Sequence, residues 1–515
     1  MDFQVVISGG GPAGMWLACE LRLANVSTLI IDQTAEIDPN SRALTIHPRT
    51  IEILASRGAH EQLLAEGARI PTGHFALLNS RLNFSGLDTP YPFTLAIFQA
   101  RTTALLQQRA IELGAVVRRG HRFVGLEERA SSVISTIEGP EGSYTVESDY
   151  LVGCDGTRST VRGAAGIDFT GTQATVLGWL GDVELRDPPP EPVLYKWSLN
   201  GMGMVVRLAD GRYRIVGINP HDIRTDWPGD FTIEELKTNS IAIFGTDFGL
   251  HSPCWLSRYG NTSRQATTYR KGRVILAGDA AHQHFPAGGV GLNVGVQDAM
   301  NLGWKLAATV HGWAPGGLLD SYHDERHPVG QDLLEHTQAQ TALMSAFTVE
   351  GQELRSFLTK LMKERPEIEV SLTERLTGLH VAYPSPQGHP LAGTRAPDLT
   401  FVGSDEHLFS MMREGKYILL DLSHADDASP VQNAHVRNAH PNRHCHRGAL
   451  SGEQRSAWSA VTAALIRPDG YVAWACEQTD PAKLAGELDR ALSATHRLTA
   501  AQAQGAARTE PAQQV

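Results

Sequence analysis

The first residues that could do chemistry lie near the start of the chain, in a glycine-rich turn. Gly9-Gly10-Gly11-Pro12-Ala13-Gly14 matches the pattern G-x-G-x-x-G, and Asp32 lies at the end of the next apolar run. Gly9 allows a tight turn, Gly11 lets a pyrophosphate approach the backbone, and Gly14 lets a helix pack closely against a strand. Free N–H groups at the start of that helix attract phosphate, and Asp32 can accept hydrogen bonds from ribose hydroxyls. The motif predicts a dinucleotide site without choosing between FAD and NAD.

Two distant motifs favour FAD. The apolar run 151–153 is followed by Asp155-Gly156, and the apolar run 274–277 is followed by Gly278-Asp279. Each motif places a carboxylate just beyond a predicted strand, far along the chain from the first glycine turn. Together the three motifs predict an FAD site.

A second concentration of glycine lies between Pro286 and Asn293. Three glycines stand within four residues, at Gly288, Gly289 and Gly291. Glycines allow a flat ring to approach the backbone closely. A long helix is predicted to begin near Leu292, and its positive end would stabilise negative charge on such a ring. This segment is therefore predicted to accept a flat ring that carries negative charge.

Regular patterns position these motifs. A strand at residues 3–8, a helix at 15–24 and a strand at 27–32 give a βαβ order, and a helix is expected at 102–113. Residues 175–269 alternate with a period near two, and Asp210-Gly211 is a hairpin signal. Helices are expected from 292 to 363, and strands at 417–422, 461–466 and 471–476.

The fold predicted from this order is α/β. We expect a discontinuous Rossmann-like FAD-binding domain, an inserted antiparallel substrate-binding sheet, a C-terminal module and a disordered tail. Their expected bounds are 1–174 with 270–390, 175–269, 391–495 and 496–515.

Composition narrows the function classes. The chain has 515 residues, 42% of them hydrophobic and 20% charged, with a formal net charge of −11. The acidic balance argues against a nucleic-acid partner, whose phosphates favour a basic face. Five scattered cysteines without a C-x-x-C pair favour a reducing cytoplasm, and no apolar run reaches the roughly 18 residues that span a membrane. A homodimer is an open expectation.

These motifs together resemble the class A flavoprotein monooxygenases, the aromatic hydroxylases with a p-hydroxybenzoate hydroxylase fold. The resemblance covers nearly the whole chain and is strongest to bacterial members that act on polyketide-type and rifamycin-type aromatics. Those members carry a C-terminal thioredoxin-like domain, which the segment 464–474 resembles without a redox cysteine pair. The family implies FAD as cofactor, with NADPH or NADH and O2 as co-substrates. O2 would add to the flavin, and the resulting C4a-hydroperoxide would deliver one oxygen atom to the substrate.

The resemblance also implies roles for individual residues. Arg42 would contact the mobile flavin during reduction, and Gln99 would lie near FAD. Asp279 would be a buried acid that binds the ribityl or pyrophosphate region, and Asp155 would face FAD and NAD(P)H. Phe123 would pass under the adenine. The cofactor-binding residues expected in the remaining motifs are Gly9, Gly11, Pro12, Ala13, Gly14, Asp32, Gly278, Gly289, Gly291, Leu292 and Asn293, with Pro286 beside the reacting ring.

Alternatives stay open. On the same fold, a Baeyer–Villiger or ring-modifying oxygenation would use the same residues, as would a flavin dehydrogenase that has lost oxygenation. A second dinucleotide fingerprint is missing, because Val206 stands where a glycine should follow Gly201-Met202-Gly203. This argues against disulfide reductases and for transient docking of NAD(P)H on the FAD domain.

Several tempting side chains have plainer interpretations. Histidines and Cys445 crowd together between 435 and 446, and we expect a solvated loop there and no metal site. His282 and His284 are expected to be structural or pocket-lining and not general bases. Aromatic and sulfur side chains of the inserted sheet are expected to be core, with some lining a pocket: Trp179, Trp197, Trp255, Met202 and Met204.

Overall fold

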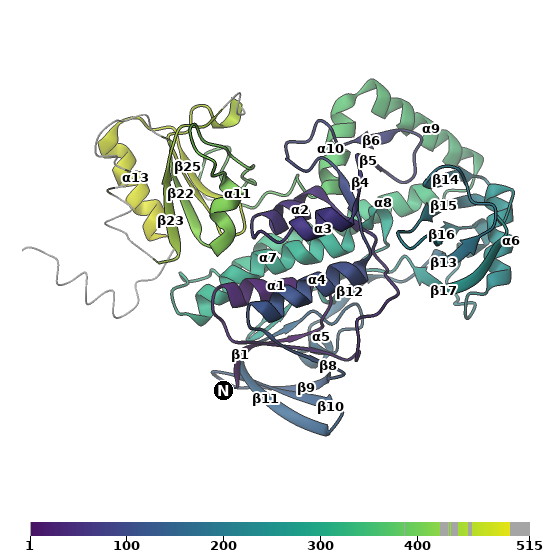
Figure 1. Cartoon of the computed structure of the whole chain (residues 1–515), viewed down its shortest axis with the longest axis horizontal. Coiled ribbons are helices and arrows are strands. Elements are labelled where there is room, and N and C mark those ends of the chain that lie inside the picture. Colours follow the sequence, from purple (N-terminus) through teal and green to yellow (C-terminus); the bar gives the residue numbers. More distant parts are fainter. Residues whose placement is uncertain are drawn as a thin grey trace, which may run out of the picture.

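The computed structural model describes residues 2–385, 387–422, 431, 433, 441–451 and 456–494. A sheet at the centre of the first domain gathers strands from distant parts of the chain (Figure 1). Its parallel strands are β8 (Val116–Arg119), β2 (Thr28–Asp32), β1 (Phe3–Ser8), β11 (Gly142–Gly153) and β20 (Val274–Leu276), in that spatial order. Antiparallel strands β9 (Arg122–Glu128), β10 (Val133–Gly139) and β19 (Arg270–Lys271) extend it.

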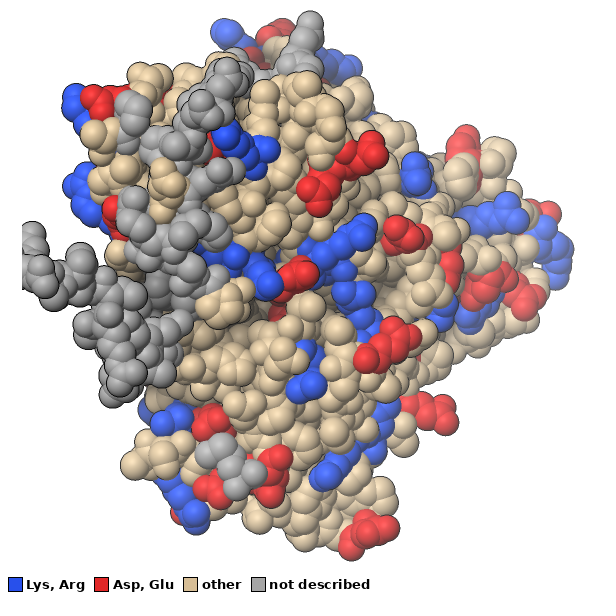
Figure 2. Space-filling view, turned by 60° about the vertical axis from the view of Figure 1, so that its left-hand side comes forward, with Lys and Arg blue, Asp and Glu red and all other residues tan. Residues whose placement is uncertain are grey.

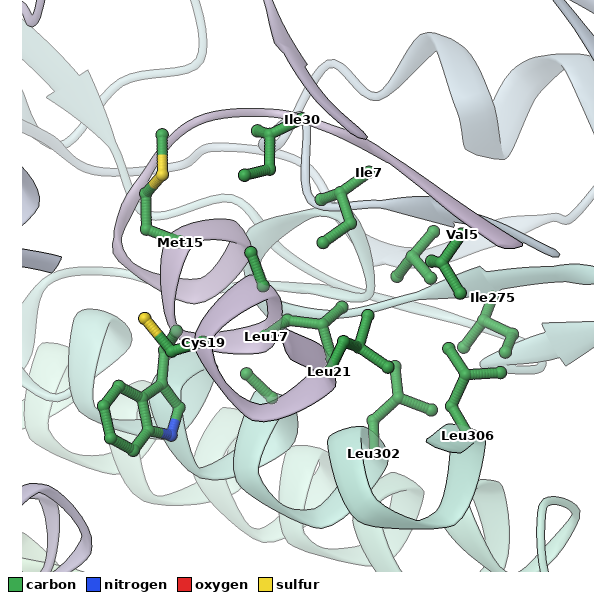
Figure 3. Close-up of a cluster of buried hydrophobic side chains, with 14 of the residues drawn as sticks. Val5, Ile7, Met15, Leu17, Cys19, Leu21, Ile30, Ile275, Leu302 and Leu306 are labelled. Carbon is green, nitrogen blue, oxygen red and sulfur yellow. The ribbon is translucent and has the colours of Figure 1, made fainter. Parts of the chain in front are cut away.

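Three long helices are packed on and around this sheet: α1 (Pro12–Leu23), α4 (Gln99–Glu112) and α7 (Gly291–Val310). Figure 3 shows the core that they form, with Leu17 and Leu21 of α1 between the strand residue Val5 and Leu302 of α7. These side chains are fully buried. The expected βαβ order is present, so the glycine turn before α1 lies at the carboxyl end of β1.

The inserted sheet is antiparallel and has the strand order β14-β15-β16-β13-β17. The strands are β13 (Leu177–Leu185), β14 (Val193–Ser198), β15 (Gly201–Arg207), β16 (Tyr213–Ile218) and β17 (Leu250–Gly260), and helix α6 (Ile233–Phe244) packs on it. The Asp210-Gly211 turn joins β15 to β16, with Gly211 at a φ of 88°. The alternating run from 193 to 208 is two strands, because the chain turns at Leu199-Asn200.

Shorter elements surround the domain. Helices α2 (Pro48–Ala55) and α5 (Thr160–Ala164) follow strands, and α3 (Glu61–Glu66) follows α2. A helical section is formed by α8 (Ser321–Ser345), α9 (Val349–Glu364) and α10 (Pro366–Thr377). The small strands are β3 (Thr45–Ile46), β4 (Ala68–Ile70), β5 (Thr72–His74), β6 (Arg81–Asn83), β7 (Thr94–Ala96), β12 (Phe169–Thr172), β18 (Ser263–Ala266) and β21 (His282–Gln283). None of the helices in the described part of the chain combines the length and hydropathy needed to cross a membrane.

The C-terminal module is a four-stranded sheet with the order β23-β22-β24-β25. Its elements are β22 (Tyr417–Asp421), β23 (Arg443–Arg447), β24 (Ala463–Ile466), β25 (Val472–Cys476), α11 (Leu408–Met411) and α13 (Pro481–Ser493). The expectation of a loop at 444–446 was wrong, because these residues form β23, which pairs in parallel with β22. His435, His440 and the tail from 496 lie outside the described residues. In Figure 1 this module and the inserted sheet lie at opposite ends of the molecule.

Candidate active site

The first glycine motif forms the turn between β1 and α1, and its glycines are sterically required. Gly9 has a φ of 112°, and a Cβ there would lie 2.2 Å from the carbonyl oxygen of Cys154. A Cβ at Gly14 would lie 2.0 Å from the carbonyl oxygen of Gly9, whereas a Cβ at Gly11 would have nothing within 4 Å. Neighbouring backbone therefore leaves no room for a side chain at Gly9 and Gly14, whereas the space beside Gly11 is open, as the spacing predicts.

The N-terminus of α1 carries no cap that would compete with a phosphate. Gly11 is its N-cap residue, Pro12 follows, and no acidic side chain lies in the first turn. Ala13 lies beside two glycines from distant segments, since a Cβ on either Gly278 or Gly295 would lie 3.3 Å from its methyl group. Small residues thus let the starts of α1, α7 and the Gly278 turn meet, which leaves several N–H groups available to an anion.

Asp32 is already engaged in bracing the turn. Its Oδ2 atom accepts a hydrogen bond from Gly10 N at 2.7 Å, and its Oδ1 atom accepts one from Thr34 N at 2.9 Å. The Arg119 guanidinium lies 3.6 Å from Oδ1. Because a carboxylate has about four lone-pair sites, Asp32 retains acceptor capacity for a ribose hydroxyl.

The two other acids differ in their surroundings. Asp279 is exposed in this structure, so the expectation of a buried acid there was wrong. Asp155 is partly buried. Its Oδ2 atom accepts bonds from Thr160 N at 2.8 Å and Val161 N at 3.1 Å, and these bonds hold the start of α5. Its Oδ1 atom is buried and has no hydrogen-bond partner among the described residues. Burial raises the pKa of Asp155.

Gln99 bonds Ala43 and so holds the segment that carries Arg42. Gln99 is the first residue of α4 and does not precede the helix; its N–H donates to Ala43 O at 3.0 Å, and its Oε1 accepts from Ala43 N at 3.1 Å. The Arg42 side chain is exposed, and its carbonyl accepts a bond from Arg214 Nη1 at 3.3 Å. This segment is thus held from two sides while the Arg42 guanidinium is left at the surface.

The sequence did not single out Arg214, which lies on β16. Its Nε and Nη2 atoms each donate to Asp182 at 2.8 Å, and both side chains are buried. Arg214 therefore connects the inserted sheet to the segment that carries Arg42. A charged residue inside the apolar alternation of β16 was the available signal.

The glycine-rich loop before α7 is fixed by side chains of its own chain. Gly288 and Gly289 have φ values of 75° and 67°, which favour glycine. Asn293 donates to Thr45 O at 3.1 Å and to Gly289 O at 3.0 Å, and its Oδ1 accepts from His47 N at 2.7 Å. The amide side chain of Asn293 therefore braces the loop.

His47 is a second loop contact that the sequence did not reveal. Its Nε2 lies 2.8 Å from the Gly288 carbonyl, and its Nδ1 lies 3.0 Å from Thr94 Oγ1. A carbonyl only accepts, so Nε2 carries the proton and Nδ1 accepts from the threonine. Burial lowers the pKa of His47 to about 4, which keeps the ring neutral at neutral pH.

The other predicted residues are distributed as follows. Leu292 and Gly291 open α7, Pro286 is exposed in the loop before it, and Phe123 is a buried core residue of β9. His282 is fully buried and bonds Asp298 through Nε2 at 2.7 Å. His284 is bonded through Nδ1 to the Phe285 carbonyl at 2.7 Å, so it too has a structural contact.

The tryptophans and methionines of the inserted sheet separate onto two faces. Trp179 is fully buried with Phe231 and α6, whereas Trp255 lies under the Arg214 guanidinium. Trp197, Met202 and Met204 belong to a cluster that includes Phe285 and Ala287 from the loop beside α7. Trp179 is core, as expected, and Trp197, Met202 and Met204 lie against the glycine-rich loop.

These features fit FAD. The uncapped helix starts and small residues suit a pyrophosphate, the free Oδ1 of Asp155 is a buried acceptor, and the glycine-rich loop suits a flat ring. Among the described residues no group of three or more histidine, cysteine or acidic side chains could hold a metal ion.

Comparisons with known proteins agree with this geometry. A family model of an FAD-binding domain matches residues 2–337, and a model of the C-terminal part of aromatic-ring hydroxylases matches residues 389–495. The chain is 45% identical over 489 residues to an uncharacterised aromatic-compound monooxygenase of Bacillus subtilis, covering 93% of this chain and 96% of the relative. It is 40% identical over 479 residues to a rifampicin monooxygenase of Streptomyces venezuelae, with 92% and 96% covered.

A solved structure gives the same result. The anhydrotetracycline hydroxylase OxyS of Streptomyces rimosus superimposes with a TM-score of 0.86 at 39% identity, covering 96% of this chain and 99% of that chain. The fold is therefore that of the FAD-dependent aromatic hydroxylases, with FAD as cofactor and NAD(P)H and O2 as co-substrates. The chain belongs to the family of FAD-binding aromatic-ring hydroxylases and is a flavoprotein aromatic monooxygenase.

Proposed function

We propose that this monooxygenase hydroxylates a large, polycyclic aromatic compound of the polyketide type. The observation that carries the proposal is the apolar cluster between the inserted sheet and the glycine-rich loop. It contains Tyr195, Trp197, Met202, Met204 and Tyr259 from the sheet, Phe285 and Ala287 from the loop, and Met344 and Phe347 at the end of α8. Aromatic and thioether side chains offer broad contact area to fused rings.

The relatives support the same substrate class. Two of them are named for rifampicin and anhydrotetracycline, which are large aromatic compounds. In the proposed arrangement the flavin ring lies against residues 286–293, and the substrate lies between that loop and the inserted sheet. Residues 9–14, Asp32 and Gly278-Asp279 hold the rest of FAD, and Gln99, Phe123 and Asp155 lie along it.

The domain division is part of the proposal. The FAD-binding part comprises 1–174 and 270–390, the substrate sheet 175–269 and the thioredoxin-like module 391–495. The strand pairing supports a separate sheet over 177–260, because those five strands pair only with one another among the described strands. Strand β18, near the end of the proposed range, pairs with β12 and β21 of the FAD-binding part. A homodimer stays a prediction that light scattering can test.

The chain's own residues position the reactants and exclude water. When bound, FAD supplies the redox chemistry that uses NAD(P)H and O2 to place one oxygen atom on the substrate. The N-terminus of α7 offers N–H groups to negative charge that develops on the ring. The bonds of Asn293 and His47 hold the loop shape, and the apolar cluster keeps the substrate side dry.

Binding of ring systems of different size tests the substrate class. Trp197 stacks on Phe347 with ring centroids 5.9 Å apart, and its indole donates to Met344 O at 3.0 Å. We expect a four-ring phenol to perturb the flavin absorbance of the holoenzyme with an affinity at least about tenfold above that of a one-ring phenol. Trp197→Ala should remove most of that difference, whereas Trp227→Ala, at an exposed tryptophan, should keep it.

Equal affinity for the two phenols, or full retention of the difference in Trp197→Ala, would contradict a polycyclic substrate held on this cluster. A product with a rearranged or opened ring would instead support Baeyer–Villiger or related chemistry at the same site.

A further inference from the structure

Charged residues lie buried where the C-terminal module meets the FAD domain. Over the face drawn in Figure 2, acidic and basic side chains are interspersed at the surface, where water screens such pairs. Helix α7 instead places Asp298, Asn301 and Lys305 on one helical face, and each is at most 1% exposed. The proposed function uses none of these three side chains. Their neighbours are Glu325 and Arg326 on α8.

One half of this network belongs to the C-terminal module. Arg467 lies in the turn between β24 and β25, and its Nη1 donates to Glu325 Oε1 at 2.7 Å. Its Nη2 lies 2.5 Å from Asp469 Oδ2. Glu325 also accepts from Lys305 Nζ at 2.7 Å. The turn of the module is thus bound to both α7 and α8.

The other half reaches the second FAD motif. Arg326 Nε donates to Asp298 Oδ1 at 2.7 Å. Asp298 Oδ2 accepts from the backbone N–H of Gly278 at 3.1 Å and from His282 Nε2 at 2.7 Å. Burial raises the pKa of Asp298, but Arg326 and His282 outweigh burial and hold it below its ordinary value. Asp298 therefore stays ionised and fixes the backbone N–H of Gly278, the residue before Asp279.

Tyr383 joins the two halves. Its hydroxyl accepts a bond from Arg326 Nη1 at 3.2 Å, and the Arg467 guanidinium lies over its ring at 5.2 Å. Tyr383 also lies against Tyr471 with ring centroids 4.2 Å apart. Direct contacts thus run from Arg467 through Tyr383 and Arg326 to the carboxylate that holds Gly278.

The charges in the network are balanced. Three carboxylates (Asp298, Glu325, Asp469) face three cations (Lys305, Arg326, Arg467). Loss of one cation would leave three buried carboxylates facing the two remaining cations. An unmatched buried charge strongly destabilises a protein. Arg326 would then be drawn between Glu325 and Asp298, and the bond from Asp298 to Gly278 would loosen.

We propose that Arg467 is a positioning residue for FAD: through Tyr383, Arg326 and Asp298 it fixes the Gly278-Asp279 turn from the C-terminal module. The inference rests on the proposed placement of FAD beside that turn. The C-terminal module, which lacks a redox cysteine pair, thereby helps to retain FAD.

A second ion pair supplies a matched control. Arg395, in the segment leading into the module, binds Glu52 of α2 with Nη1 2.9 Å from Oε1, and both side chains are largely buried. This pair also joins the module to the FAD domain. Glu52 Oε2 accepts in turn from Arg49 Nη1 at 3.1 Å, and Arg49 Nη2 donates to the backbone carbonyl of Asp469 at 2.9 Å, so the pair meets the network at a backbone atom and not at its carboxylates. Arg467→Met and Arg395→Met therefore each remove one buried arginine from the same boundary.

The test measures FAD release from the holoenzyme by the rise in flavin fluorescence on dilution, beside thermal unfolding by circular dichroism. Arg467→Met should raise the Kd for FAD by about tenfold, in the range of mutations that act through a coupled network. Arg395→Met should lower the Tm but leave the Kd within about twofold. Tyr383→Phe, which removes one hydroxyl, should raise the Kd about threefold with little change in Tm.

An unchanged Kd in Arg467→Met, or an equal rise in both arginine variants, would overturn the positioning role. If Arg467→Met does not fold, Tyr383→Phe decides, and an unchanged Kd there overturns it. Retention of FAD by Asp279→Ala would contradict the placement of FAD itself. Loss of FAD in that variant together with unchanged binding in Arg467→Met would overturn only the present inference.

Discussion

A guanidinium group can keep contact with a ligand that shifts, because its five N–H donors lie in a fixed planar fork. Arg42 offers such a group at the surface of the FAD domain, on a segment held by Gln99 and Arg214. The held backbone and free side chain suit the proposed contact with flavin and nicotinamide during reduction. The Arg42 side chain is exposed, so its guanidinium can reach a ligand.

Arg42→Lys keeps the charge and loses the fork. We expect FAD to stay bound while reduction by NAD(P)H slows by at least roughly tenfold, about 1.4 kcal/mol in the activation free energy. Anaerobic stopped-flow absorbance with substrate present measures this rate. Arg129→Lys, at an exposed pair with Glu127, should leave it unchanged. A wild-type rate in Arg42→Lys would make Arg42 a structural residue only.

Asp279 is the residue whose loss should most affect FAD retention. Its carboxylate is exposed beside Gly278, where a ligand hydroxyl or phosphate-bridging group can reach it. Asp279→Ala should weaken FAD binding by about tenfold to a hundredfold, as expected for a lost charge-assisted hydrogen bond. Flavin fluorescence on dilution measures this, with Glu141→Ala as an exposed control. Full FAD occupancy in Asp279→Ala would remove this acid from the site.

Among the structural elements, the loop from Pro286 to Asn293 depends most on distant partners. Its shape is set by Asn293 and by neutral His47, which donates to Gly288 O. The pKa of His47 is about 4 in the folded protein, against an ordinary value of 6.5. Between these values only the unfolded chain binds the proton. Stability is therefore lost as the pH falls from 6.5 toward 4, at up to about 1.4 kcal/mol per pH unit.

His47→Gln tests this contribution, because glutamine retains an N–H donor and does not titrate. Between about pH 7.5 and about pH 5 the free energy of unfolding of the variant should fall by about 2 kcal/mol less than that of the wild type. Denaturant titrations at the two pH values measure the difference, and His251→Gln, at a partly exposed histidine, should behave like wild type. Identical pH dependence in His47→Gln and wild type would show that the ring does not stay neutral in the loop contact.

Over the whole molecule, local sequence patterns predicted the helices and strands, whereas contacts between distant segments determined which side chains can reach a ligand. The turn at Gly9 and Gly14 follows from steric needs within a few residues, so its geometry was predictable. Asn293 finds its partners near residue 45, and no local pattern indicates that pairing. Strand β23 was missed because its residues, Arg443–Arg447, are alternating histidines, arginines and one cysteine without an apolar period.

The contact between the C-terminal module and the FAD domain was likewise beyond local patterns. The sequence predicted a long helix beginning near Leu292 but could not show which residues its buried side chains Asp298, Asn301 and Lys305 face. Asn301 bonds Asp469 in the turn at Arg467, 168 residues further along the chain, and Lys305 is linked to that turn through Glu325. Such pairing is a property of the assembled domains.

Isotopic labelling shows most directly whether oxygen passes from O2 to an aromatic ring. The holoenzyme would be incubated with NAD(P)H, ¹⁸O2 and a four-ring phenol, and the product analysed by mass spectrometry and NMR. We expect a product that carries one ¹⁸O atom and retains every ring. Consumption of NAD(P)H without ¹⁸O in the organic product, across a panel of polycyclic phenols, would contradict it.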